Sequence, residues 1–508
     1  MHLTHRKRKR KARGASRLVR IAGCLAVALS LGGCMLMGPN FQRPDVKLPA
    51  GYAESTENAT SPLLVPANWW RLYGDEALDK LVDAGLQQNV DVRHAIARIQ
   101  EAEALVREAN AAIFFPEIDA NVAVGRARSS TATGSLPLLT APIRNNFLLA
   151  ASTSFELDFW GRLRRIREAA IAQYAASRYA RDVVSLSLAA GITQAYFNVR
   201  SLDAQIVVSE ESLKSAADGL DIAKRRAQAG LVSDLDVNQA GAIYTQLGAQ
   251  ITDLKRQRAL AEHQLGVLTG ALDVTVAPGD LRQIPIPPLA PAGLPSTLLE
   301  RRPDLREAEE TFRSANAQIG AFRAAQFPTF SLTGVLGTQS RELSTLFSTS
   351  ASIWSIGVNA VGPLFDAGRS AARTDQAIAR ARQAAADYEK TAQTAFREVS
   401  DALSNVRLAA DTEQDLAQRV EYARNSLRLA TMRYESGYSA YLEVLDAQRT
   451  LNDAQLTLVR NRQAFLGFTV DLMNALGGGW VPGAAAPAAA GNAMGETGST
   501  DSVASIVR

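Results

Sequence analysis

Two carboxylates beside a predicted helix turn are the residues of this chain best placed to act on a charged solute. Glu443 and Asp446 lie three positions apart, so on a helix they share one face and would attract cations. The commoner interpretation of two such acids is a solvated surface. His94 and His263 each stand alone on a predicted helix, without the partners that a metal site needs. No nucleophile and base have supporting spacing, so we expect neither an enzyme nor a cofactor or metal site.

The first 33 residues have the composition of a bacterial lipoprotein signal peptide. Nine Lys and Arg residues and no acid precede position 34, and an apolar run at 21–31 leads into Leu31-Gly32-Gly33-Cys34. Cleavage would leave Cys34 as the first residue, acylated and anchored in membrane lipid, and Met35 in place of Asp favours the outer membrane. The remaining 46 basic residues face 51 acidic ones, a net charge of −5, so we expect no nucleic-acid partner.

The sequence contains an internal duplication. Arg226-x-x-x-Gly230 recurs as Arg433-x-x-x-Gly437, and Gly161-Arg162 recurs as Gly368-Arg369, in both cases 207 positions later. We predict a first structural repeat at 67–276 and a second at 300–480, separated by a Pro-rich joint at 277–299. An extended N-terminal segment at 34–66 precedes the repeats, and an Ala/Gly/Ser-rich tail at 481–508, predicted to be disordered, follows them.

Alternating apolar and polar residues predict one β-hairpin in each repeat, at about 114–160 and about 327–366. Ile118, Val122 and Phe147 belong to runs of about ten residues, the length with which a tilted β-strand crosses a membrane. A soluble sandwich sheet has the same alternation. Four strands are too few to close a barrel, however, and the segments between the paired strands are rich in Ser, Thr and Gly. Three chains would supply a 12-stranded barrel, so we expect a homotrimer.

The helices that follow each hairpin, at about 162–270 and about 369–477, are too long for an ordinary globular domain. Leu188, Ile192 and Ala195 begin a series of apolar residues at alternating steps of four and three, which is coiled-coil spacing. The stretch from 370 to 434 has no proline and would extend roughly 97 Å at 1.5 Å per residue. The predicted fold is therefore mainly α, with a membrane β-barrel portion: a duplicated unit of one β-hairpin and one long α-helical hairpin.

These features resemble the TolC class of outer-membrane efflux factors, within it the lipidated OprM or NodT-like branch that serves resistance-nodulation-division pumps. The matching residues are Gly38-Pro39-x-Phe41-x-x-Pro44 after the lipobox, Leu299-Glu300-Arg301-Arg302-Pro303-Asp304-Leu305 at the joint, and Arg433-Tyr434-x-x-Gly437 with Tyr441-Leu442-Glu443-Val444-Leu445-Asp446 after it. The resemblance implies a homotrimer whose barrel lies in the outer membrane and whose helices form a coiled-coil tunnel in the periplasm. It also implies a periplasmic adaptor and an inner-membrane efflux transporter as partners, with passive conduction of drugs or other toxic small molecules.

The resemblance also assigns roles to residues near the two helix turns. It implies that the adaptor contacts Gly230, Leu231 and Val232 on one turn and Gly437, Tyr438 and Ser439 on the other. Glu443 and Asp446 would line the periplasmic aperture of an iris-like gate. Asp236, Tyr434 and Arg462 match the positions that latch this gate, and we expect Asp236 to bond Tyr434 while Arg462 engages nearby acceptors. Ser439 and Leu235 replace an Arg and a Thr of TolC, which puts a second latch in doubt.

Two other functions are compatible with parts of this pattern. A non-conducting structural periplasmic lipoprotein would also have coiled coils, although it would not need the alternating hairpins. An outer-membrane factor for type I protein secretion would have the same fold and a different cargo, and the lipobox favours small-molecule efflux over it.

Overall fold

The computed structural model describes residues 36–49, 51–52, 65–128, 143–288 and 300–480. The predicted signal peptide, Cys34, residues 289–299 of the Pro-rich joint and the tail lie outside the described residues. The main elements, in chain order, are η1 (Trp69–Tyr73), α2 (Glu76–Gln88), α3 (Val90–Phe114), β1 (Glu117–Arg128), β2 (Ile143–Leu157), α4 (Arg162–Gln228), α5 (Asp234–Thr269), η2 (Leu281–Gln283), α7 (Pro303–Ala324), β3 (Thr329–Ser340), β4 (Ser352–Val361), α8 (Arg369–Glu435) and α9 (Tyr441–Ala475).

The chain forms two compact units, and each unit takes residues from both sequence repeats. Unit 1 comprises residues 1–52, 93–184 and 294–398, and unit 2 comprises 53–92, 185–293 and 399–508. Helices α4 and α8 have 67 residues each and contribute to both units, which is why the spatial division cuts across the duplication. At 1.5 Å per residue each of these helices extends about 100 Å.

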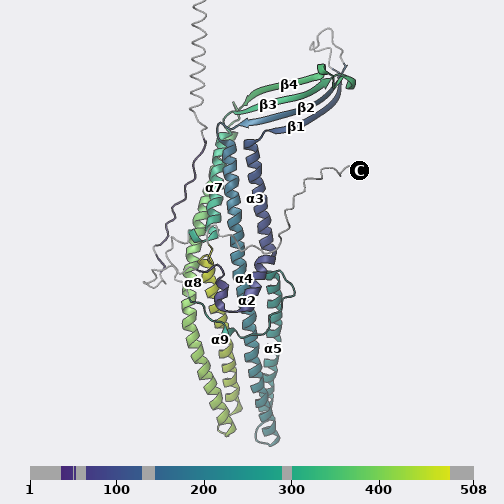
Figure 1. Cartoon of the computed structure of the whole chain (residues 1–508). Helices are drawn as coiled ribbons and strands as arrows, with labels where there is room; N and C mark the ends of the chain where they lie inside the picture. The colour runs from purple at the N-terminus through teal and green to yellow at the C-terminus, as the bar shows by residue number, and fades with distance from the viewer. Residues whose placement is uncertain (1–35, 50, 53–64, 129–142, 289–299, 481–508) are drawn as a thin grey trace, which may run out of the picture. The chain divides into compact units, whose positions relative to one another are not determined.

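Unit 1 contains one four-stranded antiparallel sheet in the order β1-β2-β3-β4 (Figure 1). Each repeat supplies one hairpin, and the two hairpins join through β2 and β3. The register places Val124 opposite Phe147 and Leu332 opposite Val358, so apolar side chains of all four strands share one face. Among the described residues, strands β1 and β4 each have a single partner, so both edges of the sheet are unpaired there.

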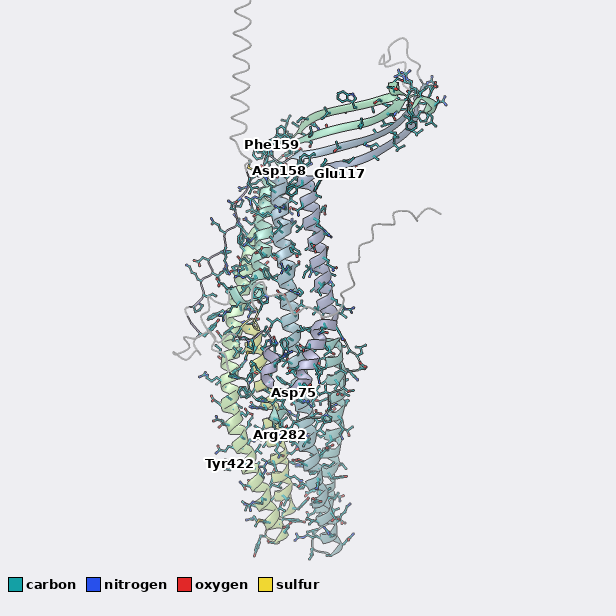
Figure 2. All side chains as sticks on the ribbon, in the orientation of Figure 1. Asp75, Glu117, Asp158, Phe159, Arg282 and Tyr422 are labelled. Carbon is teal, nitrogen blue, oxygen red and sulfur yellow. The ribbon has the colours of Figure 1, made fainter. Side chains whose placement is uncertain are left out.

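The junction between β2 and α4 is fixed by polar and aromatic contacts within unit 1. The Asp158 carboxylate accepts hydrogen bonds from the Leu163 and Arg164 backbone N–H groups at 3.2 and 3.0 Å, which caps the first turn of α4. Figure 2 shows Asp158 and the neighbouring Phe159 where the strand gives way to the helix. The Trp160 indole donates to the Pro328 carbonyl at 2.8 Å, so this junction is tied to the start of β3.

The segment that follows the predicted anchor residue is held against α4 by a buried arginine. The side chain of Arg165 is 1% exposed and donates to the carbonyls of Met37 and Gly38 and to the Asn40 side chain, at 3.0 to 3.3 Å. A Cβ at Gly320 of α7 would lie 2.4 Å from the Met37 carbonyl oxygen, so the segment requires glycine at that contact.

Unit 2 contains the two helical turns. Figure 1 shows α5 beside the later part of α4 and α9 beside the later part of α8, with both turns at the same end of the unit. Ala240, Ile243 and Leu247 of α5 pack in one buried cluster with Tyr434 of α8 and Val444 of α9. Small residues recur in these cores because they let long helices approach closely.

A network of buried and half-buried charges holds the segment before η2 onto α4 and α5 in unit 2. Asp203 of α4 accepts from the Arg258 Nε at 2.5 Å and from the Gly279 N–H at 3.2 Å. Arg258 and Arg200 in turn donate to the carbonyls of Val276 and Ala277, at 2.7 and 2.5 Å. Asp75, labelled in Figure 2, caps α2 and accepts from the Tyr196 hydroxyl of the same unit.

In the described part of the chain, no helix has both the length and the apolar character of a membrane span.

Candidate functional site at the helix turns

The two helix turns of unit 2 have the same backbone geometry at equivalent positions of the repeats. Gly230 and Gly437 have φ of 71° and 79°, the left-handed conformation that glycine accepts without strain. The next N–H groups, of Leu231 and Tyr438, donate to the carbonyls of Arg226 and Arg433 at 2.9 and 2.8 Å. This is the Schellman pattern that ends a helix, so the glycines are helix caps, whatever else the turns contact.

The surface of the turns is apolar in part. Leu231 and Tyr438 are 72% and 80% exposed, although both are large apolar or aromatic residues. Val232 and Ser439 are half-buried beside them. Exposed apolar side chains at two adjacent turns are typical of a protein contact site.

Arg226 joins the two turns, a role that the sequence does not reveal. Its Nη1 and Nη2 donate to the carbonyls of Tyr434 and Glu435 at 3.0 and 2.8 Å. Its guanidinium carbon lies 4.6 Å from the centre of the Tyr434 ring. The residue therefore supplies positive charge and donors to the unsatisfied carbonyl end of α8, which is favourable for any helix C-terminus. The repeat anchor identified this arginine but not its partner.

The predicted aperture residues are both exposed, but their charges are not equally free. Glu443 pairs with Arg433 across 3.6 Å, while its side chain remains 52% exposed. Asp446 follows on the same exposed face of α9, and Val444 and Leu445 between them are buried. In the structure both carboxylates are thus exposed on α9, and the basic neighbour Arg433 offsets part of the Glu443 charge.

Tyr434 and Tyr441 form the aromatic centre of the turn region. Their ring centroids are 5.0 Å apart, and a Cβ at Gly219 of α4 would lie 2.5 Å from the Tyr441 hydroxyl. Burial, with smaller contributions from Tyr434 and from the negative charge of Asp236, raises the pKa of Tyr441 to about 12. Tyr441 belongs to the sequence motif at this turn, but its packing role was not predicted.

Within the single chain, the predicted latch residues are not all together. The Tyr434 hydroxyl is buried and has no hydrogen-bond partner among the described residues, so Asp236 does not bond it here. Arg462 lies on α9, roughly 30 Å along the helix from Tyr441 at 1.5 Å per residue. It donates to the Glu413 carboxylate at 3.2 Å and to the Ile284 carbonyl at 2.8 Å.

No three His, Cys, Asp or Glu side chains within the described ranges are grouped so that they could hold a metal ion. The turn region presents carboxylates, one ion pair and buried tyrosines, a set that can attract and admit solutes but that includes no nucleophile with an adjacent base.

Solved structures with this architecture include outer-membrane channels. The outer-membrane channel OprN superposes with a TM-score of 0.80 at 27% identity, covering 87% of this chain and 99% of that one. A membrane protein from Pseudomonas aeruginosa gives a TM-score of 0.79 at 32% identity, covering 87% of this chain and 98% of its own. The fold and the paired helix turns therefore define the class: this chain is an outer-membrane efflux channel protein.

Sequence comparison gives the family. The model described as "Outer membrane efflux protein" matches residues 81–271 and 294–478, one stretch in each repeat. The toluene efflux pump outer membrane protein TtgF of Pseudomonas putida is 34% identical over 90% of this chain and 96% of its own length. The cation efflux system protein CusC of Escherichia coli O6:H1 is 33% identical over 89% and 97%. The chain belongs to the outer membrane efflux protein family, a family of channels and not of enzymes, which confirms the resemblance and the outer-membrane location.

Proposed function

We propose that three copies of this chain form the exit duct of a tripartite pump, through which small toxic compounds leave passively. The observation that carries the proposal is the open sheet with its exposed apolar face. Val122, Trp354 and Ile356 on that face are 73%, 75% and 73% exposed, a cost that a water-soluble domain avoids and a lipid environment removes. Closure of the unpaired β1 and β4 edges against copies would give a 12-stranded barrel.

The aromatic residues at the helix end of the sheet agree with a membrane boundary there. Phe114, Phe115 and Phe365 are 62%, 70% and 90% exposed, and Phe159 packs edge-to-face on Phe330 at 5.3 Å. Aromatic girdles flank the apolar band of outer-membrane barrels. The helices would then continue from this boundary into the periplasm.

The architecture has a direct test. Chemical cross-linking of the purified chain in detergent should give a trimer as the largest product, and planar bilayers should show discrete conductance steps. A monomer with no conductance would overturn the proposal. A chain that forms trimers without conductance would point instead to a structural lipoprotein.

For the cargo we propose small organic toxicants, delivered by an inner-membrane transporter through a periplasmic adaptor. The relatives are named for toluene, antibiotic and cation efflux, and the described residues offer no metal cluster that would favour the last. Deletion of the gene should sensitise cells to solvents and antibiotics and leave tolerance of metal cations unchanged. Sensitivity to metals alone would reject this cargo, and co-purification with tagged chain tests the adaptor.

For the gate we propose that Glu443 and Asp446 form the aperture and that Asp236 reaches the buried Tyr434 hydroxyl only in the assembled, closed trimer, with Arg462 as a further latch. The orphaned hydroxyl supports this proposal, because a buried phenol without a partner is unfavourable. Tyr434→Phe should raise single-channel conductance. Tyr438→Phe, at the 80% exposed position, is the matched control. Equal conductance of both variants and wild type would reject the latch.

Lipidation of Cys34 stays a prediction. Mass spectrometry of the mature N-terminus should show a diacylglycerol thioether on Cys34, and Cys34→Ala should abolish it. An unmodified cysteine would refute the anchor.

A further inference from the structure

The end of the sheet farthest from the helices carries arginines on its apolar face. Side chains alternate along β1, so Arg126 and Arg128 lie on the same face as Ile118, Val122 and Val124. The register places Arg126 opposite Asn145 and Arg128 opposite Ile143 of β2. Both arginines are exposed. The apolar face therefore ends in two positive charges at its distal border.

These charges have no acidic neighbours in sequence. Residues 120–155 contain three arginines, at 126, 128 and 144, and neither Asp nor Glu. The connection between β3 and β4 adds Arg341 and Glu342, whose charges offset each other. Among the described residues Arg126 and Arg128 take part in no ion pair, and the acid-free composition of 129–142 excludes one with that segment. Charge is thus available for an anionic ligand from outside the chain.

The position of the two arginines relative to the apolar band selects the kind of ligand. They follow Val124 by two and four residues, roughly 7 and 14 Å along the strand at 3.4 Å per residue. Arginine on the lipid face costs about 2–4 kcal/mol at the bilayer midplane and almost nothing at the interface. Its long side chain can cover apolar surface while the guanidinium reaches the headgroups, where a phosphate accepts two parallel hydrogen bonds. Phe330 of β3 lies at the opposite end of the same face, where it packs against Phe159.

We propose that Arg126 and Arg128 bind the phosphate of an anionic lipid in the outer leaflet, so that each trimer binds such lipids around its distal rim. The inference rests on the proposed membrane-spanning barrel and deepens it, because it assigns the distal border of the apolar face to a phosphate-bearing headgroup. A free phosphate offers the same oxygen atoms but no acyl chains to lie along Val122 and Val124.

The test compares lipid binding by full-length, purified protein in detergent, read by native mass spectrometry. The probes are bisphosphorylated lipid A, the same lipid without its phosphates, and inorganic phosphate. The variant is Arg126→Gln with Arg128→Gln. The matched control is Arg93→Gln with Arg107→Gln, which removes two exposed arginines from α3. Far-ultraviolet circular dichroism and cross-linking establish that all forms fold and assemble alike.

We expect the double variant at 126 and 128 to bind bisphosphorylated lipid A roughly 10- to 30-fold more weakly, since each basic residue near a membrane surface contributes about a factor of five. The control should bind as wild type does, and the dephosphorylated lipid should not distinguish the proteins. Equal binding of the phosphorylated lipid by both variants would overturn the proposal. Saturation by inorganic phosphate at similar concentrations would show a free-phosphate site and also overturn it. Conductance is measured on the same samples. If wild type shows no conductance, the proposed barrel is refuted. If wild type conducts normally and the double variant at 126 and 128 binds the phosphorylated lipid as strongly as wild type does, only the lipid site is refuted.

Discussion

Removal of the Arg226 side chain should loosen the turn of the other repeat. In Arg226→Ala, the half-buried bond to the Tyr434 carbonyl contributes about 1.5 kcal/mol, the exposed bond to Glu435 about 0.5, and the contact with the Tyr434 ring about 0.5–1. The turn should therefore open about 2.5–3 kcal/mol more easily. Hydrogen exchange of peptides covering 428–445 should then be roughly 70- to 150-fold faster.

The duplication supplies the matched control for this experiment. Arg433 is the equivalent residue, but among the described residues its side chain forms only a 3.6 Å ion pair with Glu443, in which both side chains are more than half exposed. Arg433→Ala should change exchange by no more than about twofold, because exposed pairs contribute about 0.5 kcal/mol or less. Equal effects of the two substitutions would refute the reasoning, since it depends on the different partners of the two arginines.

Three further predictions concern the segment after the anchor, the tyrosine cluster and the aperture. Gly320→Ala should lower the midpoint of thermal unfolding, because the new Cβ meets the Met37 carbonyl. Gly248→Ala, with open space around the new Cβ, should raise this midpoint through helix propensity. A rise in both variants would contradict the close contact between Gly320 and Met37. The neutral Tyr441 phenol contributes stability that is fully present below its ordinary pKa of 10 and is lost as pH rises towards 12. At pH 11, Tyr441→Phe should therefore retain a larger fraction of its free energy of unfolding than wild type does, as measured by denaturant titration. Equal losses of stability at alkaline pH in the two proteins would count against the burial of this phenol. Asp446→Asn should reduce the cation preference in reversal-potential measurements more than Glu443→Gln, since Arg433 already offsets Glu443; the opposite order would contradict the ion pair.

Periodicity predicted the elements because each has an unambiguous pattern. The alternation around Ile118 and Val122 belongs to β1, and the proline-free stretch from 370 to 434 lies inside α8. Gly230 and Gly437 were identified because a reversal between long helices needs positive φ. Each of these features depends on residues close together in the sequence, so the sequence alone predicts it.

The partners of side chains could not be predicted in the same way. The duplication suggests equal roles for Arg226 and Arg433, yet one reaches across to the other turn and the other pairs on its own hairpin. The burial of Arg165 under the segment at 37–40 joins residues about 125 positions apart, and no periodic signal records such a contact. The division into two units, each with residues of both repeats, could not be predicted either, because it depends on three-dimensional packing.

The unpaired edges of β1 and β4 have a consequence for inheritance. Closure of the proposed ring would require every subunit to pair both its β1 edge and its β4 edge with a neighbour. One subunit with a damaged edge would therefore inactivate a trimer that also contains two intact subunits. In a cell that makes normal and edge-damaged chains in equal amounts, about one ring in eight would be free of damage. Alleles that disrupt these strands should therefore behave as dominant, and cells that carry them alongside an intact gene should lose most of their efflux.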